Sequence, residues 1–407
     1  MCYRAGFVKY FSLRKNRRCK ISVFFRNFVC VMAGLYIHIP FCRTRCIYCD
    51  FYSTVGEELQ GRYIEALLQE WRLRRGELRG ERVDTLYIGG GTPSQLPPVL
   101  LQRLFDGLGK DIDFDRCREI TFEANPDDVS PAYAACLASL PIDRISMGVQ
   151  SFADENLRFL RRRHTSAQAV GAVERLRTVG FSRISIDLIY GLPGQTPDSW
   201  AGDLRQAVSL GLPHISAYNL IYEEGTSLDR LRQEGLVQEC GEDLSSRLFE
   251  MTIDVLANAG YEQYEISNFA RSGEYARHNT SYWQDVPYLG LGPSAHSYDR
   301  SVRRRNIPDL MRYIAQIEIG HAAYETERID DNTRYNDRVI TSLRTMWGLD
   351  LDAIAADFGE ARRDYCLRMA RPHIKNGLLA YVGGRLTVTR RGLFISDGIM
   401  ADLLYVD

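Results

Sequence analysis

Three cysteines with a short, regular spacing, Cys42, Cys46 and Cys49, are the residues best suited to chemistry. Thiolates separated by three residues and then two can converge from one loop on a single soft metal centre. A [4Fe–4S] cluster has four iron corners, so three thiolates leave one iron open to a ligand or substrate. The alternatives are a zinc site and three unrelated cysteines. Zinc prefers four ligands, usually from C-x2-4-C pairs, so a lone C-x3-C-x2-C run favours the cluster.

The cysteine loop follows residues 35–40, an apolar run that predicts a buried strand. Ser130-Pro131 and Thr196-Pro197 are typical helix starts, with a hydroxyl N-cap and proline in the first turn. Short strands that alternate with such helices predict βαβ units and a parallel sheet. We therefore expect an α/β fold, a partial (β/α)6 TIM-like barrel, with its site at the carboxyl ends of the strands. The other expected strands are residues 85–88, 120–123, 144–149, 183–189 and 214–220.

The order of the predicted elements changes near residue 331, where the alternation of strands and helices ends. Helices are expected over 331–347, 351–358 and 362–376, followed by a hairpin over 378–389 that turns at Gly383-Gly384, and by a last helix from Gly392. This order predicts a small α+β winged-helix-like domain. Residues 331–407 carry 11 basic and 10 acidic residues, so the basic footprint of a DNA-binding module is missing. We expect a packing or partner-docking domain and no nucleic-acid partner.

Composition narrows the class of protein. The 407 residues have a net charge of −1, and the ten cysteines show no paired spacing outside the 42–49 loop. This pattern indicates a reducing compartment, the cytoplasm, rather than a secreted disulfide framework. The sequence has no stretch of 18 uncharged apolar residues, so we predict no transmembrane helix.

Domain boundaries follow from these patterns. Residues 1–31 contain eight Lys/Arg and no acidic residue. They are interpreted as a basic extension, either disordered or outside a true start at Met32 rather than Met1, and peripheral membrane association is a third interpretation. The barrel is expected over 32–300, a connecting segment over 301–330 and the C-terminal domain over 331–407.

Several motifs resemble one known family, in the same order along the chain. They are Tyr36–Cys42 (YIHIPFC), the three-cysteine run, Gly89–Ser94 (GGGTPS) and Ile186–Pro193 (IDLIYGLP). This set resembles the radical S-adenosylmethionine (SAM) proteins, and more narrowly the coproporphyrinogen dehydrogenase relatives, from about Gly34 to Tyr298. The resemblance implies that Cys42, Cys46 and Cys49 hold a [4Fe–4S] cluster and that SAM chelates its fourth iron.

The same resemblance implies a set of SAM contacts. A triple glycine lets backbone N–H groups approach the methionine moiety. Arg162 suits its carboxylate, and Asp187 or Glu123 suits a ribose hydroxyl or the ammonium group. Plain turns and a helix cap are the alternatives for the glycines and Asp187. The implied contacts are Tyr36, Tyr48, Gly90, Gly91, Thr92, Glu123, Gln150, Arg162 and Asp187.

Two features favour one branch of the family. The porphyrinogen-oxidising branch carries a further cysteine at the position of Phe51. The run His278–Trp283 matches an HNxxYW motif that the HemW-type haem-chaperone branch associates with haem. A neutral imidazole is a suitable axial ligand for haem iron, so His278 is a candidate. The alternative is a hydrogen-bonded histidine in an aromatic core. His296 is a weaker candidate, and His38 is expected to be structural.

Three functions remain open at this point. The first is a haem chaperone that carries haem to acceptor haem proteins such as respiratory-chain components. The second is an oxygen-independent coproporphyrinogen III dehydrogenase, in which a reduced cluster cleaves SAM to a radical. The third is a radical SAM enzyme with an unrelated substrate. Whether SAM is turned over is not fixed by the sequence, nor is the oligomeric state, for which we consider a homodimer.

Overall fold

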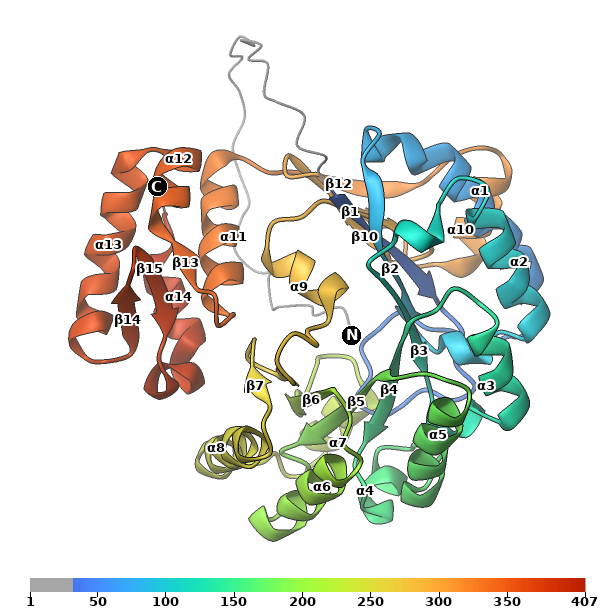
Figure 1. Ribbon diagram of the computed structural model, residues 1–407, viewed down its shortest axis with the longest axis horizontal. Coiled ribbons are helices and arrows are strands. Elements are labelled where there is room, and N and C mark those ends of the chain that lie inside the picture. The colour runs from blue at the N-terminus through green and yellow to red at the C-terminus, as the bar shows by residue number, and fades with distance from the viewer. Residues whose placement is uncertain (1–31, 407) are drawn as a thin grey trace.

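A computed structural model describes residues 32–406, so the basic extension with Met1 lies outside the described residues. Six parallel strands form the centre of the fold in the sheet order β1-β2-β3-β4-β5-β6 (Figure 1). This order confirms the expected partial (β/α)6 barrel. The strands are β1 (Met32–Ile39), β2 (Arg82–Gly90), β3 (Glu119–Ala124), β4 (Arg144–Gln150), β5 (Arg183–Tyr190) and β6 (His214–Asn219).

Helices connect successive strands, and most of the helices listed below cover the outer face of the sheet (Figure 1). Two of them begin as expected: the Ser130 hydroxyl accepts the N–H of Tyr133, and the Thr196 hydroxyl accepts the N–H of Ser199. The helices are α1 (Gln60–Arg74), α2 (Pro98–Leu108), α3 (Pro131–Ala138), α4 (Asp154–Phe159), α5 (Ser166–Thr178), α6 (Pro197–Ser209), α7 (Ser227–Gln233) and α8 (Glu242–Asn258).

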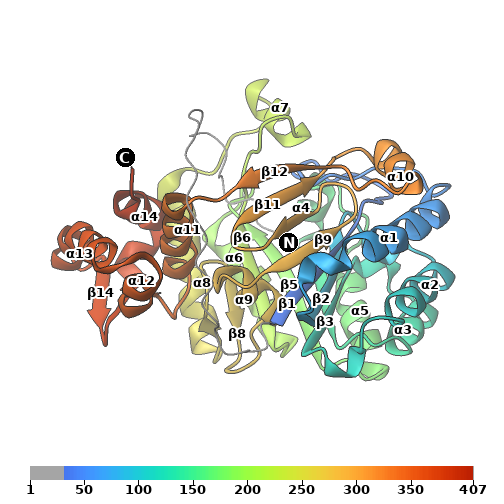
Figure 2. The same ribbon diagram turned by 90° about the horizontal axis from the view of Figure 1, so that it is seen from above.

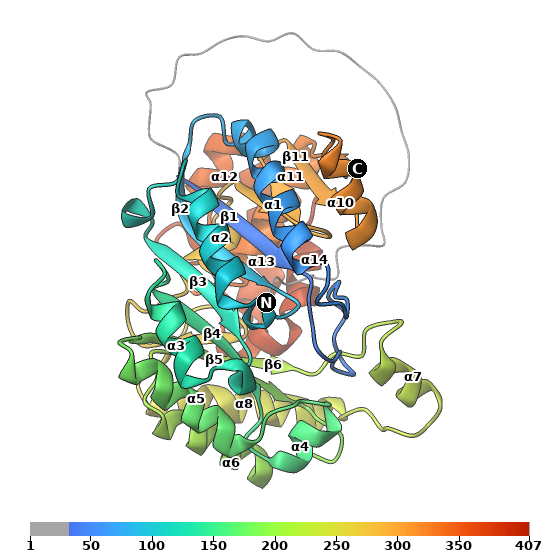
Figure 3. The same cartoon turned by 90° about the vertical axis from the view of Figure 1, so that its right-hand side faces the viewer.

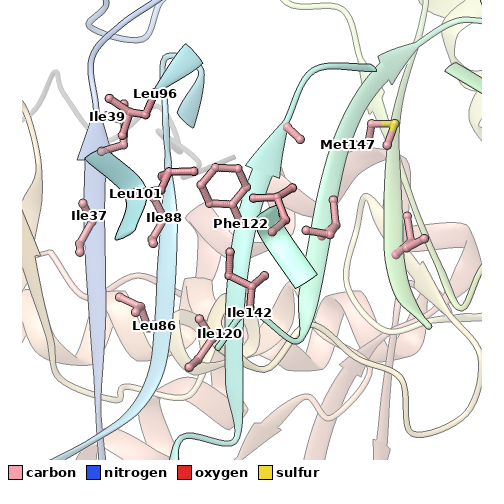
Figure 4. Close-up of a cluster of buried hydrophobic side chains, with 14 of the residues drawn as sticks. Ile37, Ile39, Leu86, Ile88, Leu96, Leu101, Ile120, Phe122, Ile142 and Met147 are labelled. Atoms are coloured by element: carbon pink, nitrogen blue, oxygen red, sulfur yellow. The ribbon is translucent and has the colours of Figure 1, made fainter. Parts of the chain in front are cut away.

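Strands β3 to β6 alternate between apolar and polar residues, because successive side chains point to opposite faces. The apolar set, which includes Ile120, Phe122 and Met147, packs in the main hydrophobic core (Figure 4). The alternate positions are polar and buried, and many barrels instead fill this space with branched apolar side chains. They include Thr121, Arg144, Ser146, Ser185, Asp187, His214 and Ser216.

The sheet continues beyond β1 into a second half. Strand β9 pairs in parallel with β1, and three antiparallel strands follow it, so the sheet has 12 strands in the described part of the chain. At the other edge, β8 pairs with β6. The additional elements are β7 (Glu262–Gln263), β8 (Asn268–Ala270), α9 (Arg277–Trp283), β9 (Tyr288–Leu291), β10 (His296–Tyr298), β11 (Val302–Asn306), α10 (Leu310–Glu318) and β12 (Tyr324–Arg328).

Residues 301–330, expected to be a plain connection, therefore contain two strands of this sheet and a helix. Strand β11 reads Val-Arg-Arg-Arg-Asn, without the apolar alternation that marks a strand in sequence. A buried ion pair within α1 contacts this half: Arg74 and Glu70 are 2.7 Å apart, and Arg74 also donates to Ser297 in β10. Burying two charges is tolerated here because both find several hydrogen-bond partners.

The C-terminal part has its own hydrophobic core and the expected helices-then-hairpin order (Figure 2). The hairpin turns at Gly383 and Gly384, both with positive φ, which suits a two-residue turn. Two details differ from expectation: α11 already ends at Leu343, and residues 390–395 form a 3-10 turn before the last helix. The elements are α11 (Asp331–Leu343), β13 (Leu349–Asp350), α12 (Leu351–Phe358), α13 (Glu360–Lys375), β14 (Leu379–Val382), β15 (Arg385–Val388) and α14 (Ser396–Leu403).

Ion pairs connect this C-terminal part to the barrel. Arg338 on α11 lies 2.9 Å from Asp285, and Asp337 pairs with Arg303 on β11. Within the described residues, no helix has both the length and the apolar character needed to cross a bilayer.

Candidate functional site

The cysteine loop leaves β1 at its carboxyl end and returns to form a closed turn. The N–H of Cys42 donates to Thr54 O at 3.0 Å, and that of Cys49 donates to Cys46 O at 3.3 Å. Leu228 at the start of α7 donates its N–H to Ile47 O, and Figure 3 shows this loop and α7 on the same side of the sheet. The three thiols are partly exposed and belong to one short loop that neighbouring segments hold in place.

The thiols lie in an environment suited to a bound cluster. Burial is the main cause that raises the pKa of Cys42, and burial followed by the charge of Cys46 raises the pKa of Cys49 to about 12. A metal must therefore displace their protons when it binds. No three His, Cys, Asp or Glu side chains of residues 32–406 converge on a single-ion position. A cluster binds each thiolate to a different iron, so it needs wider spacing than zinc does.

The glycine run lies directly beside this loop. Gly90 has φ +111°, and a Cβ there would lie 2.7 Å from the ring of His38. A Cβ on Gly91 would lie 3.0 Å from the carbonyl oxygens of Ile39 and Phe41. The run is therefore required by the close approach of β1 and β2, and it is no plain surface turn. Its N–H groups are already used: Gly90 donates to Glu123, and Gly91 donates to Ile39 O.

Glu123, at the end of β3, connects the glycine run to two aromatic rings. It accepts the hydroxyl of Tyr87 at 2.5 Å and the N–H of Gly90 at 3.1 Å. Tyr36 packs against Tyr87 with ring centroids 6.2 Å apart, and its hydroxyl is 2.9 Å from His38 Nδ1. Tyr36, Glu123 and Gly90 are therefore brought together, and His38 has the structural role expected for it.

Gln150 and Arg162 each have a buried polar atom without a hydrogen-bond partner among the described residues. Gln150 ends β4 with φ +71°, an unfavourable conformation for a residue with a side chain, and its buried Oε1 has no hydrogen bond among described residues. Arg162 donates to Cys46 Sγ at 3.3 Å and to Gly148 O at 2.7 Å, while its buried Nε has no partner there. Strain together with orphaned atoms indicates a site built to receive a polar ligand.

The remaining predicted contacts border the same space. Thr92 Oγ1 is 3.3 Å from Cys42 Sγ. Tyr48, within the loop, packs against the apolar cluster that contains Leu160 and Leu228, and burial raises its pKa well above the ordinary value. Asp187 on β5 is buried, and this burial raises the pKa of its carboxyl group. The site thus draws on the loop and on all of β1 to β5, and its residues fit a cluster with a bound SAM.

His278 lies at the opposite, amino-terminal end of the barrel. Its imidazole is fully buried, with Nδ1 2.8 Å from Thr85 Oγ1 and Nε2 2.7 Å from the Tyr282 hydroxyl. Glu119 accepts the N–H groups of Arg277 and His278 at the start of α9. Both ring nitrogens therefore have partners, which is the alternative arrangement of a hydrogen-bonded histidine in an aromatic core.

Tyr87 links the two ends and was not singled out from the sequence. Its ring stacks on His278 with centroids 5.2 Å apart, while its hydroxyl reaches Glu123. The signal was present, because Tyr87 is the register partner of Tyr36 on the neighbouring strand. Residues paired in a parallel sheet point to the same face, so the implied role of Tyr36 could have been extended to Tyr87.

Comparison with family models gives two matches along the chain. The radical SAM superfamily matches residues 36–207, which include the cysteine loop and strands β1 to β5. The HemN C-terminal domain matches residues 329–395. The matches thus cover the candidate site and most of the C-terminal part separately.

Comparison with known proteins extends this similarity to nearly the whole chain. The chain is 39% identical over 281 residues to heme chaperone HemW of Lactococcus lactis, covering 69% of this chain and 73% of the relative. It is 34% identical over 378 residues to heme chaperone HemW of Mycobacterium tuberculosis, covering 91% and 94%. The structure of coproporphyrinogen III oxidase (HemN) from Escherichia coli, a radical SAM enzyme, matches with TM-score 0.81 and 26% identity, covering 92% and 90%.

Proposed function

The chain belongs to the HemW-type family of radical SAM proteins, and from this membership we propose that it binds haem and delivers it to acceptor haem proteins. The observation that carries the proposal is the similarity to heme chaperones over 94% of the length of one relative. Phe51 supports it, because the porphyrinogen-oxidising branch resembled by these motifs has a cysteine there. We place this delivery in the cytoplasm, in keeping with the absence of paired cysteines.

In this proposal Cys42, Cys46 and Cys49 hold a [4Fe–4S] cluster, and SAM binds between the loop and the strand ends. When bound, the two groups together supply one-electron chemistry. Arg162 binds the SAM carboxylate, and Glu123 and Asp187 bind its hydroxyl or ammonium groups. The glycine run lets β1 and β2 lie close together beside the cysteine loop, and α7 is hydrogen-bonded to that loop through Leu228 and Ile47.

The second candidate function is oxidative decarboxylation of coproporphyrinogen III. The close structural match to coproporphyrinogen III oxidase favours it, since the two folds agree over 92% of this chain. Phe51 disfavours this function, because the porphyrinogen-oxidising branch of the family has a cysteine at that position. A fold hosts many activities, so the match alone does not decide between carrying and oxidising a tetrapyrrole.

The experiment is an anaerobic titration of the reconstituted protein with haem, followed by visible absorbance, beside an assay of coproporphyrinogen decarboxylation. Tight binding with a shifted Soret band and no decarboxylation is the expected result. Transfer is then measured by mixing the haem-loaded protein with an apo-cytochrome and following the acceptor's spectrum. Turnover to protoporphyrinogen without stable haem binding would establish the second function instead.

The position of the haem is tested in the same titration. If His278 ligates the iron, it must first give up its bonds to Thr85 and Tyr282. His296, on β10, is exposed and serves as the matched variant. A Soret shift lost in His278→Gln and kept in His296→Gln would support ligation by His278. A shift retained in both variants would reject both as ligands.

A further inference from the structure

Arg144, the first residue of β4, has a guanidinium group that the proposed function does not use. Its side chain is 2% exposed, and its Nη1 has no hydrogen-bond partner among the described residues. Leaving a buried donor of a charged group without a hydrogen-bond partner is unfavourable. Arg183 is its register partner on β5 and offers a direct contrast. Arg183 lies 3.0 Å from Glu119 and 2.8 Å from Asp143.

Two more unpartnered groups lie around the same small cavity inside the barrel. Thr121 and His214 line it together with Arg144, and Thr121 Oγ1 and His214 Nδ1 have no partner in residues 32–406. The Tyr264 hydroxyl accepts the N–H of Ala276 and lies 2.8 Å from His214 Nε2. A guanidinium N–H, a hydroxyl and an imidazole nitrogen thus border one space without a hydrogen-bond partner among the described residues.

Asp187, which also lines the cavity, is the one carboxylate among the described lining residues that could neutralise Arg144 there. Its hydroxyl partner is Ser216, and no hydrogen bond or salt bridge joins it to Arg144 in the described chain, although the charge of Arg144 acts on it. Burial is the largest effect on the pKa of Asp187 and raises it, which weakens Asp187 as a counter-charge. The cavity volume of about 10 Å³ has room for one water-sized particle. Its donors and its size suit a single small anionic group.

We propose that Arg144, with Thr121 and His214, forms a buried site for one monovalent anionic group inside the barrel. The group is either a free ion such as chloride or formate, or the carboxylate at the end of a cargo side chain. Haem carries two such propionate arms, and only this second source rests on the proposed function. In both cases the charge-assisted hydrogen bonds to the guanidinium supply the binding.

The free-ion source is tested on the apoprotein by replacing chloride with methanesulfonate, a bulkier anion, at constant ionic strength. We expect the melting temperature to be about 2–5 °C higher in saturating chloride or formate. Arg144→Met removes this difference, and Arg183→Met retains it. Crystals soaked in bromide should show an anomalous peak within hydrogen-bond distance of Arg144, which tests the site even if Arg144→Met does not fold.

The cargo source is tested by comparing haem with haem dimethyl ester, which lacks carboxylates. If a propionate occupies the site, wild type binds haem at least tenfold more tightly than the ester, and Arg144→Met abolishes the preference while Arg183→Met keeps it. Equal binding of both by wild type, together with the chloride effect, assigns the site to free ions. The proposal is overturned if neither the anions nor the ester distinguishes wild type from Arg144→Met and no bromide peak appears. Failure of haem binding altogether would reject the proposed function and leave the anion experiments valid.

Discussion

The two ends of the barrel carry the two motifs that resemble the family most, and they differ in how their polar atoms are used. At the carboxyl ends of the strands, Gln150 and Arg162 hold buried atoms without partners, beside partly exposed thiols. At the amino ends, His278 is fully buried and both its ring nitrogens are bonded. The polar atoms around the cysteine loop are therefore arranged to receive a ligand, whereas those of the His278 ring hold the chain in place.

This difference teaches that a motif resemblance alone does not distinguish a binding residue from a positioning one. Satisfied polar atoms contribute to stability, and atoms left unsatisfied in a buried place require an explanation. Tyr87 lies between the two ends and contacts both, through its ring and its hydroxyl. A change at the amino end is therefore expected to reach the cofactor end through this side chain.

The largest expected effect is at the carboxyl end. Cys46→Ser should abolish the visible absorbance of the cluster in anaerobically purified protein, because a hydroxyl is a poor ligand for iron–sulfur iron. Cys136→Ser, at a cysteine on α3 outside the loop, should leave it unchanged. Iron and sulfide analysis beside the absorbance spectrum checks this. Retained absorbance in Cys46→Ser would contradict the ligand assignment.

The next largest effect is expected at the amino end, and it is on stability. His278→Ala removes the hydrogen bonds that Thr85 and Tyr282 make to the imidazole and the stack on Tyr87, so it should cost about 3 kcal/mol or more of unfolding free energy. His321→Ala, at an exposed histidine, should cost less than about 0.5 kcal/mol. Urea unfolding measures both. A His278→Ala protein as stable as wild type would break the contrast between the two ends of the barrel.

Two glycines, Gly90 and Gly180, distinguish the effect of close packing from the effect of backbone strain. A methyl group added at Gly90 meets the ring of His38, whereas one added at Gly180, which has a similar φ of +105°, has nothing within 4 Å. We expect Gly90→Ala to lower the free energy of unfolding by about 2 kcal/mol more than Gly180→Ala does. Both variants place alanine at a positive φ, but only the first also forces a methyl group into an occupied space. Denaturant unfolding measures the difference. Equal losses would mean that the glycine run is needed for its dihedral angles alone.

The smallest effect is a pH dependence. Burial lowers the pKa of His278 from 6.5 to about 3. Below pH 6.5 the unfolded chain binds a proton that the folded protein does not, so stability falls as the pH falls. Between pH 7.5 and 5.5 this residue should account for ~1.4 kcal/mol. The measurement is the difference in this pH dependence between wild type and His278→Gln. An unchanged dependence would show that the pKa of His278 is the same in the folded and unfolded states.

Much of the fold was open to prediction because it rests on local patterns. Each of the six parallel strands is a short buried stretch with regularly placed apolar residues and turn residues at its end, and the caps at Ser130 and Thr196 form as expected. Strand β11 was missed, because an arginine-rich run becomes a strand only through pairing with β10 and β12. Such pairing is a tertiary effect that overrides local preference.

The candidate site was predictable in part. The cysteines and glycines have a fixed spacing, which can be read directly from the sequence. The environment of His278 cannot be read in this way, because its partners Thr85 and Glu119 come from distant strands. Arg144 carried a weaker signal: its strand reads Arg-Ile-Ser-Met, an alternation that places a charge on the inner face of the barrel.

The sheet order has a consequence for the timing of synthesis. Strand β1 is bordered by β2 on one side and by β9 on the other, so one of its edges stays open until residues 288–291 have been made. At roughly 5–20 residues per second, a ribosome needs on the order of tens of seconds to cover that gap. During this interval the strand that leads into the cysteine loop has an unpaired edge that is prone to aggregation. The nascent chain therefore depends on protection of this edge before its last strands arrive.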